Sequence, residues 1–128
     1  MAQKILGLRT TIYKVADVDQ AKEWYAKAFE VQPYFDEPFY VGFEVGGYEL
    51  GLQPEETSVN DKPESVLTYW GVEDINAEFN RFIALGATEH EAPTEVGGGI
   101  LVATVKDPWG NIVGLIYNPH FKLPSGQE

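Results

Sequence analysis

Histidine, cysteine and serine carry much of enzyme chemistry, and this sequence offers few arrangements of them. Its two histidines are His90 and His120, and it has no cysteine, which excludes disulfides, thiolate catalysis and cysteine-based metal centres. No serine stands in a nucleophile turn followed by an acid and a histidine. Neither histidine has a matched partner near it in the sequence. We therefore expect both to be solvated or incidental, and we assign no catalytic residue.

Two glycine clusters, at 46–47 and 97–99, have the composition of a phosphate cradle. Such a cradle requires a helix to begin directly after the glycines, because the N–H groups of the first helical turn point at the anion. Each cluster is instead followed by an apolar run typical of a strand. We interpret both clusters as turns.

The chain is strongly acidic. Its 20 Asp and Glu residues and 9 Lys and Arg residues give a net charge of −11, which repels phosphate backbones and argues against nucleic acid as a partner. A cationic ligand would be attracted, although the acidity would also serve solubility alone. No apolar run is long enough to span a membrane, and the start of the chain does not resemble a secretion signal. We expect a soluble, cytoplasmic protein without a membrane partner.

Hydrophobic periodicity divides the first half into one strand, one helix and three further strands. Apolar residues spaced by three and four from Val18 to Phe29 predict a buried helix face. Asp17, with Gln20 three residues later, supplies a cap for the start of this helix. The glycine pair 46–47 between apolar runs predicts a tight hairpin. The strands are expected at 8–15, 31–35, 39–45 and 48–53.

The second half repeats this order at an offset of about 56 to 57 residues, which indicates a duplicated module. The step Val15-Ala16-Asp17 recurs as Val72-Glu73-Asp74, and a second amphipathic helix follows, with Gly86 placed to end it in a left-handed conformation. Strands are expected at about 88–92, 100–106 and 112–117. We predict a single domain over 1–128, with module one at about 5–53, a linker at 54–65, module two at about 66–118 and a polar tail at 119–128.

This pattern closely resembles the vicinal oxygen chelate superfamily of glyoxalases, bleomycin resistance proteins and extradiol dioxygenases. The resemblance rests on the two strand–helix–three-strand modules, on Val-X-Asp before each helix, and on Asp107-Pro108-Trp109-Gly110-Asn111 before the last strand, and it covers nearly the whole chain. It implies an α+β fold in which two tandem βαβββ modules form a curled mixed β-sheet around a cavity, with the helices packed outside. It also implies a homodimer, which long strand edges that need covering would favour.

The resemblance also indicates where a metal would lie. Metal-dependent members of the superfamily place histidine, carboxylate or amide ligands on the first and fourth strands of each module, and a divalent metal needs about three or four such ligands. Superposing the two Val-X-Asp steps places the four positions at Thr10, Gly51, Leu67 and Gly114. A shift by two residues would bring Glu49 or Gln53 to the first module's site, which is still too few ligands. We therefore predict no metal and no other cofactor.

Glycine and leucine at these positions would leave an apolar space of the kind that small molecules occupy. Alternation along the strands assigns one face to this cavity and the other to the helices. The candidate ligand-binding residues are Thr10, Ile12, Glu49, Gly51, Gln53, Leu67, Tyr69, Gly114 and Ile116. The residues expected under the helices are Tyr13, Val15, Leu50, Leu52, Trp70, Val72, Val113 and Leu115.

These features favour a metal-independent small-molecule-binding protein of the bleomycin-resistance type, which would sequester a drug-like or cationic compound. Two alternatives stay open: a metal-dependent glyoxalase-like lyase, isomerase or dioxygenase, and a structural or regulatory dimer without a ligand. Fold analogy alone does not choose among them. An aromatic cluster near Pro38 would serve as core, as a dimer contact or as a stacking surface for a planar ligand. It comprises Tyr34, Phe35, Phe39 and Tyr40.

Overall fold

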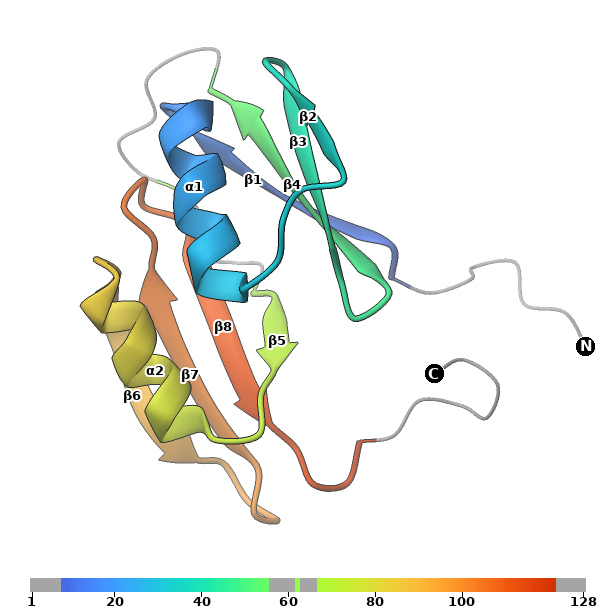
Figure 1. Cartoon of the computed structure of the whole chain (residues 1–128). Helices are drawn as coiled ribbons and strands as arrows, with labels where there is room; N and C mark the ends of the chain where they lie inside the picture. Colours follow the sequence, from blue (N-terminus) through green and yellow to red (C-terminus); the bar gives the residue numbers. More distant parts are fainter. Residues whose placement is uncertain (1–7, 56–61, 63–66, 122–128) are drawn as a thin grey trace, which may run out of the picture. The chain divides into compact units, whose positions relative to one another are not determined.

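The computed structural model of the chain describes residues 8–55, 62 and 67–121. It contains two compact units, one within Met1–Lys62 and the other within Pro63–Glu128, and each has the order strand, helix, three strands (Figure 1). The predicted α+β fold of tandem βαβββ modules is confirmed. Most of the predicted linker at 54–65 and of the polar tail at 119–128 lies outside the described residues. Neither described helix is long and apolar enough to cross a membrane.

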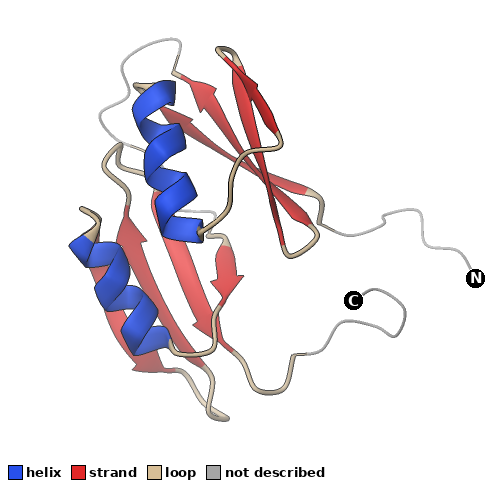
Figure 2. Cartoon of the chain, in the orientation of Figure 1, coloured by secondary structure: helices blue, strands red, loops and turns tan. Residues whose placement is uncertain are grey.

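The first unit is a four-stranded mixed sheet with one helix against it. Its strands lie in the order β1-β4-β3-β2, with β1 and β4 parallel and the other neighbours antiparallel. The elements are β1 (Thr10–Val15), α1 (Val18–Phe29), β2 (Phe35–Glu37), β3 (Tyr40–Val45) and β4 (Tyr48–Pro54). In each unit the helix lies on one face of its own sheet (Figure 2).

Helix α1 begins and ends through local hydrogen bonds. The Gln20 amide donates to Asp17 Oδ1 at 3.1 Å, which confirms Asp17 as the cap and satisfies an amide that has no partner within the helix. The helix ends at Glu30, whose φ of 56° is left-handed, and the Val31 amide donates back to the Ala26 carbonyl at 3.2 Å. The turn is of the type that glycine usually occupies, although a glutamate stands here.

The core of the first unit lies between α1 and its sheet. Tyr13 stacks on Tyr25 of α1 with ring centroids 5.7 Å apart, and Val15, Leu50 and Leu52 have no exposed surface. These four sheet residues were predicted to pack under the helix, and the prediction is confirmed. Because neighbouring strand residues point to opposite faces, the residues between them lie on the face away from α1.

Strand β2 differs from the prediction. A strand was expected at 31–35, but β2 begins at Phe35 and all three of its residues are exposed. The Val31 amide is used to close the end of α1, and Pro33 has no N–H to give to a ladder. The apolar run that suggested a strand therefore belongs to the helix end and the connection that follows it.

The second unit repeats the architecture, with strand order β5-β8-β7-β6. Asp74 caps α2 by accepting from the Ala77 amide at 3.1 Å. Gly86 has a φ of 112°, as predicted for the helix end, and the Ala87 amide donates to the Phe82 carbonyl at 3.1 Å. The elements are β5 (Tyr69–Gly71), α2 (Ile75–Ala84), β6 (Thr88–Glu95), β7 (Leu101–Lys106) and β8 (Ile112–Tyr117). The buried residues between α2 and the sheet include Ile75, Phe79, Phe82, Ala103, Val105, Val113 and Leu115.

The turn from β7 to β8 is organised around one buried carboxylate. Asp107 is only 3% exposed, and its Oδ1 accepts from the amides of Trp109 at 2.9 Å and Asn111 at 2.7 Å. Its Oδ2 accepts from the Asn111 side-chain amide at 2.9 Å, and Gly110 takes a φ of 89°. The motif at 107–111 therefore serves to build the turn.

Candidate functional site

In the first unit, the sheet face away from α1 carries five of the predicted ligand-binding residues. The parallel register pairs Thr10 with Glu49 and Ile12 with Gly51, and Gln53 lies two residues further along β4. The residue opposite Thr10 is therefore Glu49, which is the two-residue shift that the sequence left open. The first and fourth strands bring one hydroxyl and one carboxylate together at this point.

Three hydroxyl groups converge on the carboxylate of Glu49. The Thr10 hydroxyl donates to Oε1 at 3.0 Å, and the Tyr34 hydroxyl donates to Oε2 at 2.5 Å. The Tyr40 hydroxyl also lies near this carboxylate and helps to lower the pKa of Glu49. Four side chains from β1, β3, β4 and the segment before β2 thus form one polar cluster, which we call the Glu49 cluster.

The hydrogen bonds determine the charge of the Glu49 cluster. Donation from Tyr34 is the largest influence on the pKa of Glu49 and lowers it, partial burial opposes this, and Thr10 and Tyr40 lower it further. Burial, followed by the interaction with Glu49, raises the pKa of Tyr40 to about 12, and the bond to Glu49 raises the pKa of Tyr34. At neutral pH the cluster is an ionised carboxylate beside three protonated hydroxyls. Because these pKa values move away from neutrality, the cluster is better suited to holding a charge than to transferring a proton.

The space expected beside Gly51 is filled by a side chain of the same unit. Gly51 is the cross-strand partner of Gly42, and a Cβ built on Gly51 would lie 2.7 Å from Cζ of Tyr40. A Cβ on Gly42 would lie 3.1 Å from Cε1 of Tyr34. The two glycines therefore let two phenol rings lie close to the sheet with their hydroxyls near Glu49.

The aromatic cluster near Pro38 is divided between two roles. Tyr34 and Tyr40 belong to the Glu49 cluster, which the sequence reasoning did not identify. Phe35 and Phe39 are exposed, and their rings pack edge to face at 6.1 Å. Counting back from the hairpin turn could have placed Tyr40 on the same face as Gly42, because residues two apart in a strand share a face.

In the second unit, the equivalent face carries the other four predicted residues. Tyr69 pairs with Gly114, and Ile116 pairs with Gly71; Leu67 is exposed just before β5. A Cβ on Gly114 would lie 2.6 Å from Cδ1 of Tyr69 and 2.7 Å from the Thr68 carbonyl oxygen. The space expected at Gly114 is therefore also filled, here by a neighbouring ring and by main chain.

His90 has a partner that the sequence reasoning missed. Its Nδ1 lies 2.8 Å from the hydroxyl of Thr104, and Thr104 is 1% exposed and pairs with Gly114. The two side chains hydrogen-bond across β6 and β7, which explains how a buried hydroxyl is satisfied. His120, in the loop after β8, has its Nε2 2.7 Å from the Gly98 carbonyl oxygen.

The residues present do not fit a divalent metal. Glu49 is the one carboxylate at the Thr10 position, and its oxygens already accept hydrogen bonds from Thr10 and Tyr34. In the second unit Tyr69 pairs with Gly114 as Ile12 pairs with Gly51, so the places that correspond to Thr10 and Glu49 hold Leu67 and Ile112, which offer no metal ligand. Within residues 8–55, 62 and 67–121, no three His, Cys, Asp or Glu side chains form a group that could hold a metal ion.

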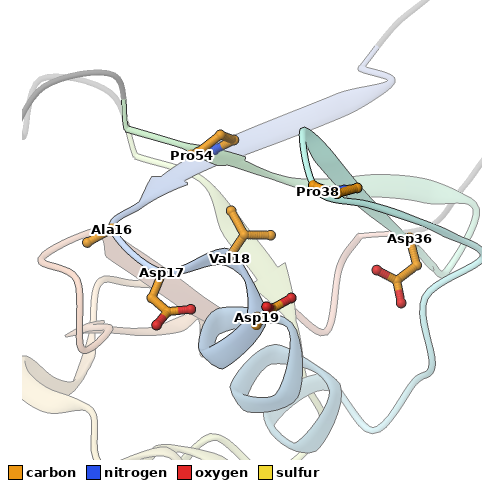
Figure 3. A pocket seen from close by; sticks show the side chains of 7 residues that line it. All are labelled: Ala16, Asp17, Val18, Asp19, Asp36, Pro38 and Pro54. Atoms are coloured by element: carbon orange, nitrogen blue, oxygen red, sulfur yellow. The ribbon is translucent and has the colours of Figure 1, made fainter.

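A shallow hollow of about 380 Å³ lies at the start of α1 (Figure 3), and no residue of the Glu49 cluster lines it. Three aspartates line it, together with Ala16, Val18, Pro38 and Pro54. Asp17 is occupied in capping α1, and Asp36 forms an ion pair with Lys22 at 3.0 Å. Two of the three carboxylates therefore have structural partners, and we assign no site to this hollow.

Solved structures share the fold of the chain at low sequence identity. A glyoxalase-related enzyme from Fulvimarina pelagi superposes with a TM-score of 0.78 at 18% identity, covering 94% of each chain. A lactoylglutathione lyase from Agrobacterium tumefaciens has a TM-score of 0.71 at 21% identity, with 91% of this chain and 96% of that chain covered. A glyoxalase/bleomycin resistance protein/dioxygenase family enzyme from Burkholderia phytofirmans has a TM-score of 0.73 at 19% identity, with 84% and 95% covered.

No curated protein matches the chain by sequence. Residues 7–115 match the family model described as Glyoxalase/Bleomycin resistance protein/Dioxygenase superfamily. This match spans most of the chain and includes both modules and the turn at 107–111. The chain belongs to the glyoxalase/bleomycin resistance protein/dioxygenase superfamily.

Proposed function

We propose that the chain is a metal-independent binding protein for a small organic molecule, which lies on the face of the first sheet beside the Glu49 cluster. The observation that carries this proposal is the carboxylate of Glu49, held ionised by Thr10, Tyr34 and Tyr40 where β1 and β4 pair. Ile12, on the same face, is 45% exposed. A charged group beside exposed apolar and aromatic surface is the usual composition of a small-molecule site.

The metal-dependent alternative is a lyase such as the one that the Agrobacterium tumefaciens neighbour is named for. It would need several metal ligands at one place, whereas Thr10 and Glu49 supply one hydroxyl and one carboxylate already engaged in hydrogen bonds. The residues of this chain therefore support binding without a metal better than they support metal-assisted catalysis.

A fragment screen monitored by NMR tests the proposal. We would record amide spectra of the ¹⁵N-labelled chain with neutral, cationic and anionic aromatic fragments, with chelator and then with added zinc, nickel or manganese. The proposal expects at least one fragment to shift the amides of Thr10, Ile12, Glu49 and Gly51 in the presence of chelator. Binding that requires added metal would favour the lyase alternative. If no fragment shifts these amides under any condition, the dimer without a ligand becomes the better interpretation.

We also propose that the chain forms a homodimer. Strand β2 lies at the edge of its sheet, and its residues are exposed. An edge strand presents unpaired main-chain groups that a second chain can pair with. The exposed rings of Phe35 and Phe39 lie at this edge as well. Sedimentation equilibrium at micromolar concentration should give twice the chain mass of 14.3 kDa. A mass of one chain at all concentrations tested would contradict the proposal.

A further inference from the structure

The Glu49 carboxylate can accept further hydrogen bonds. An ionised carboxylate offers about four acceptor positions, and Thr10 and Tyr34 use one on each oxygen. The ion pairs between side chains of the described residues involve Asp36, Glu55 and Glu78, and none involves Glu49. The hydroxyls donate hydrogen bonds but carry no positive charge. Glu49 therefore keeps a full negative charge and at least one acceptor position.

The surroundings of that position are aromatic and accessible. Tyr34 is 64% exposed while its hydroxyl stays on Glu49, and its ring lies close to Gly42. Tyr40 lies close to Gly51, the cross-strand partner of Gly42. A cation beside the carboxylate would also have the exposed ring of Tyr34 next to it, and an aromatic ring attracts a cation that lies over its face.

The open acceptor position separates kinds of cation. A protonated amine or a guanidinium group can donate an N–H to Glu49. A quaternary ammonium has no N–H to use the position.

We propose that the ligand of the Glu49 cluster is a cation with N–H groups, a protonated amine or a guanidinium, carried on an aromatic or apolar body. The cationic group donates to an open acceptor position of Glu49, and the body lies along Ile12 and the ring of Tyr34. This inference rests on the proposed binding function and specifies the chemical class of its ligand.

A series of compounds with one body and different head groups tests the inference. The probes are 2-phenylethylamine, its guanidine and trimethylammonium analogues, 2-phenylethanol and 3-phenylpropionate, each titrated into the ¹⁵N-labelled protein at low salt. The amine should bind at least about tenfold more tightly than the alcohol, as expected for a hydrogen bond between charged groups. Glu49→Gln should remove this preference. Glu37→Gln, which removes the same charge from the exposed strand β2, should leave it within about twofold.

A comparison within the series tests the need for an N–H donor. The guanidine analogue should share the amine's preference over the alcohol, and the trimethylammonium analogue should bind more weakly than the amine, because it cannot donate a hydrogen bond to Glu49. The inference is overturned if the alcohol binds as tightly as the amine, if Glu49→Gln keeps the amine preference, or if the trimethylammonium analogue binds as tightly as the amine. In these cases compounds still shift the amides of the face, so the binding function survives. If neither this series nor the fragment screen shifts those amides, the binding function itself fails.

Discussion

Two glycines at equivalent places in the two units should respond differently to the same substitution. Gly51 and Gly114 each lie on the fourth strand of a module, opposite Ile12 and Tyr69, and neither has a positive φ. A change to alanine therefore causes no left-handed strain at either position. What differs is the group that the new methyl would meet.

At Gly114 the obstacle is partly main chain. A Cβ would lie 2.7 Å from the Thr68 carbonyl oxygen, and the same carbonyl accepts the Gly114 amide at 3.0 Å. Relief of the overlap would push β8 away from the segment before β5 and weaken that bond. Overpacking costs about 1–3 kcal/mol, and a weakened hydrogen bond adds about 1 kcal/mol. We expect Gly114→Ala to reduce the free energy of unfolding by about 2–4 kcal/mol.

At Gly51 the obstacle is the outer end of one side chain. The methyl would meet the hydroxyl of Tyr40, with Cζ at 2.7 Å, and rotation of the ring would relieve the overlap. This rotation would move the Tyr40 hydroxyl away from Glu49, at a cost of at most about 1–1.5 kcal/mol. Alanine would recover about 0.5–1 kcal/mol because glycine destabilises a strand. The net loss for Gly51→Ala should be below about 1 kcal/mol.

Urea unfolding of the two variants measures this difference, and double variants identify its cause. In a Tyr40→Ala background, Gly51→Ala should become neutral or stabilising, because the obstacle is gone. In a Tyr69→Ala background, Gly114→Ala should keep most of its cost, because the Thr68 carbonyl remains. Equal losses for the two single variants, or full rescue of Gly114→Ala by Tyr69→Ala, would refute the reasoning.

Three further predictions concern a helix end, a turn and an ionised group. Glu30→Gly should raise the free energy of unfolding by about 1 kcal/mol, because Glu30 has a left-handed φ of 56° that glycine adopts without strain; an unchanged urea midpoint would argue against strain at this site. Asp107→Ala should lower the unfolding free energy by about 3 kcal/mol, since it leaves the buried amide of Asn111 and the part-buried amide of Trp109 without their acceptor, and a loss below about 1 kcal/mol in the same assay would contradict the role given to this turn. Folding lowers the pKa of Glu49 from its ordinary value of 4.5. The stability contributed by the ionised carboxylate is therefore complete above the pKa of the unfolded chain and is lost as the pH falls through the pKa of the folded protein. Glu49→Gln should lose this acid dependence, and an identical profile of stability against pH for the variant would show that the hydroxyls do not stabilise the anion.

Features that depend on neighbouring residues could be predicted from the sequence. Asp17 caps α1 as expected, and Asp74, which stands at the same place in the repeated Val-X-Asp step, caps α2 in the same way, because each reaches an amide three residues away. The helix-facing residues of β1 and β4 followed from alternation, which is a property of any strand. Strand β2 could not be placed in this way, because its short exposed edge has no alternation and the apolar residues before it complete the end of α1.

The sequence by itself determined the duplicated modules, the two helices, the cap of the first helix, the helix-facing residues of β1 and β4, and the scarcity of metal ligands at the superfamily's positions. Only the tertiary structure decided that Glu49 lies opposite Thr10, that Tyr34 binds it and Tyr40 lies near it, and that His90 meets Thr104. It also decided that rings and main chain fill the places beside Gly51 and Gly114. The reason is physical: periodicity and capping act within a few residues, whereas these contacts join strands whose register is set by the packing of a whole sheet.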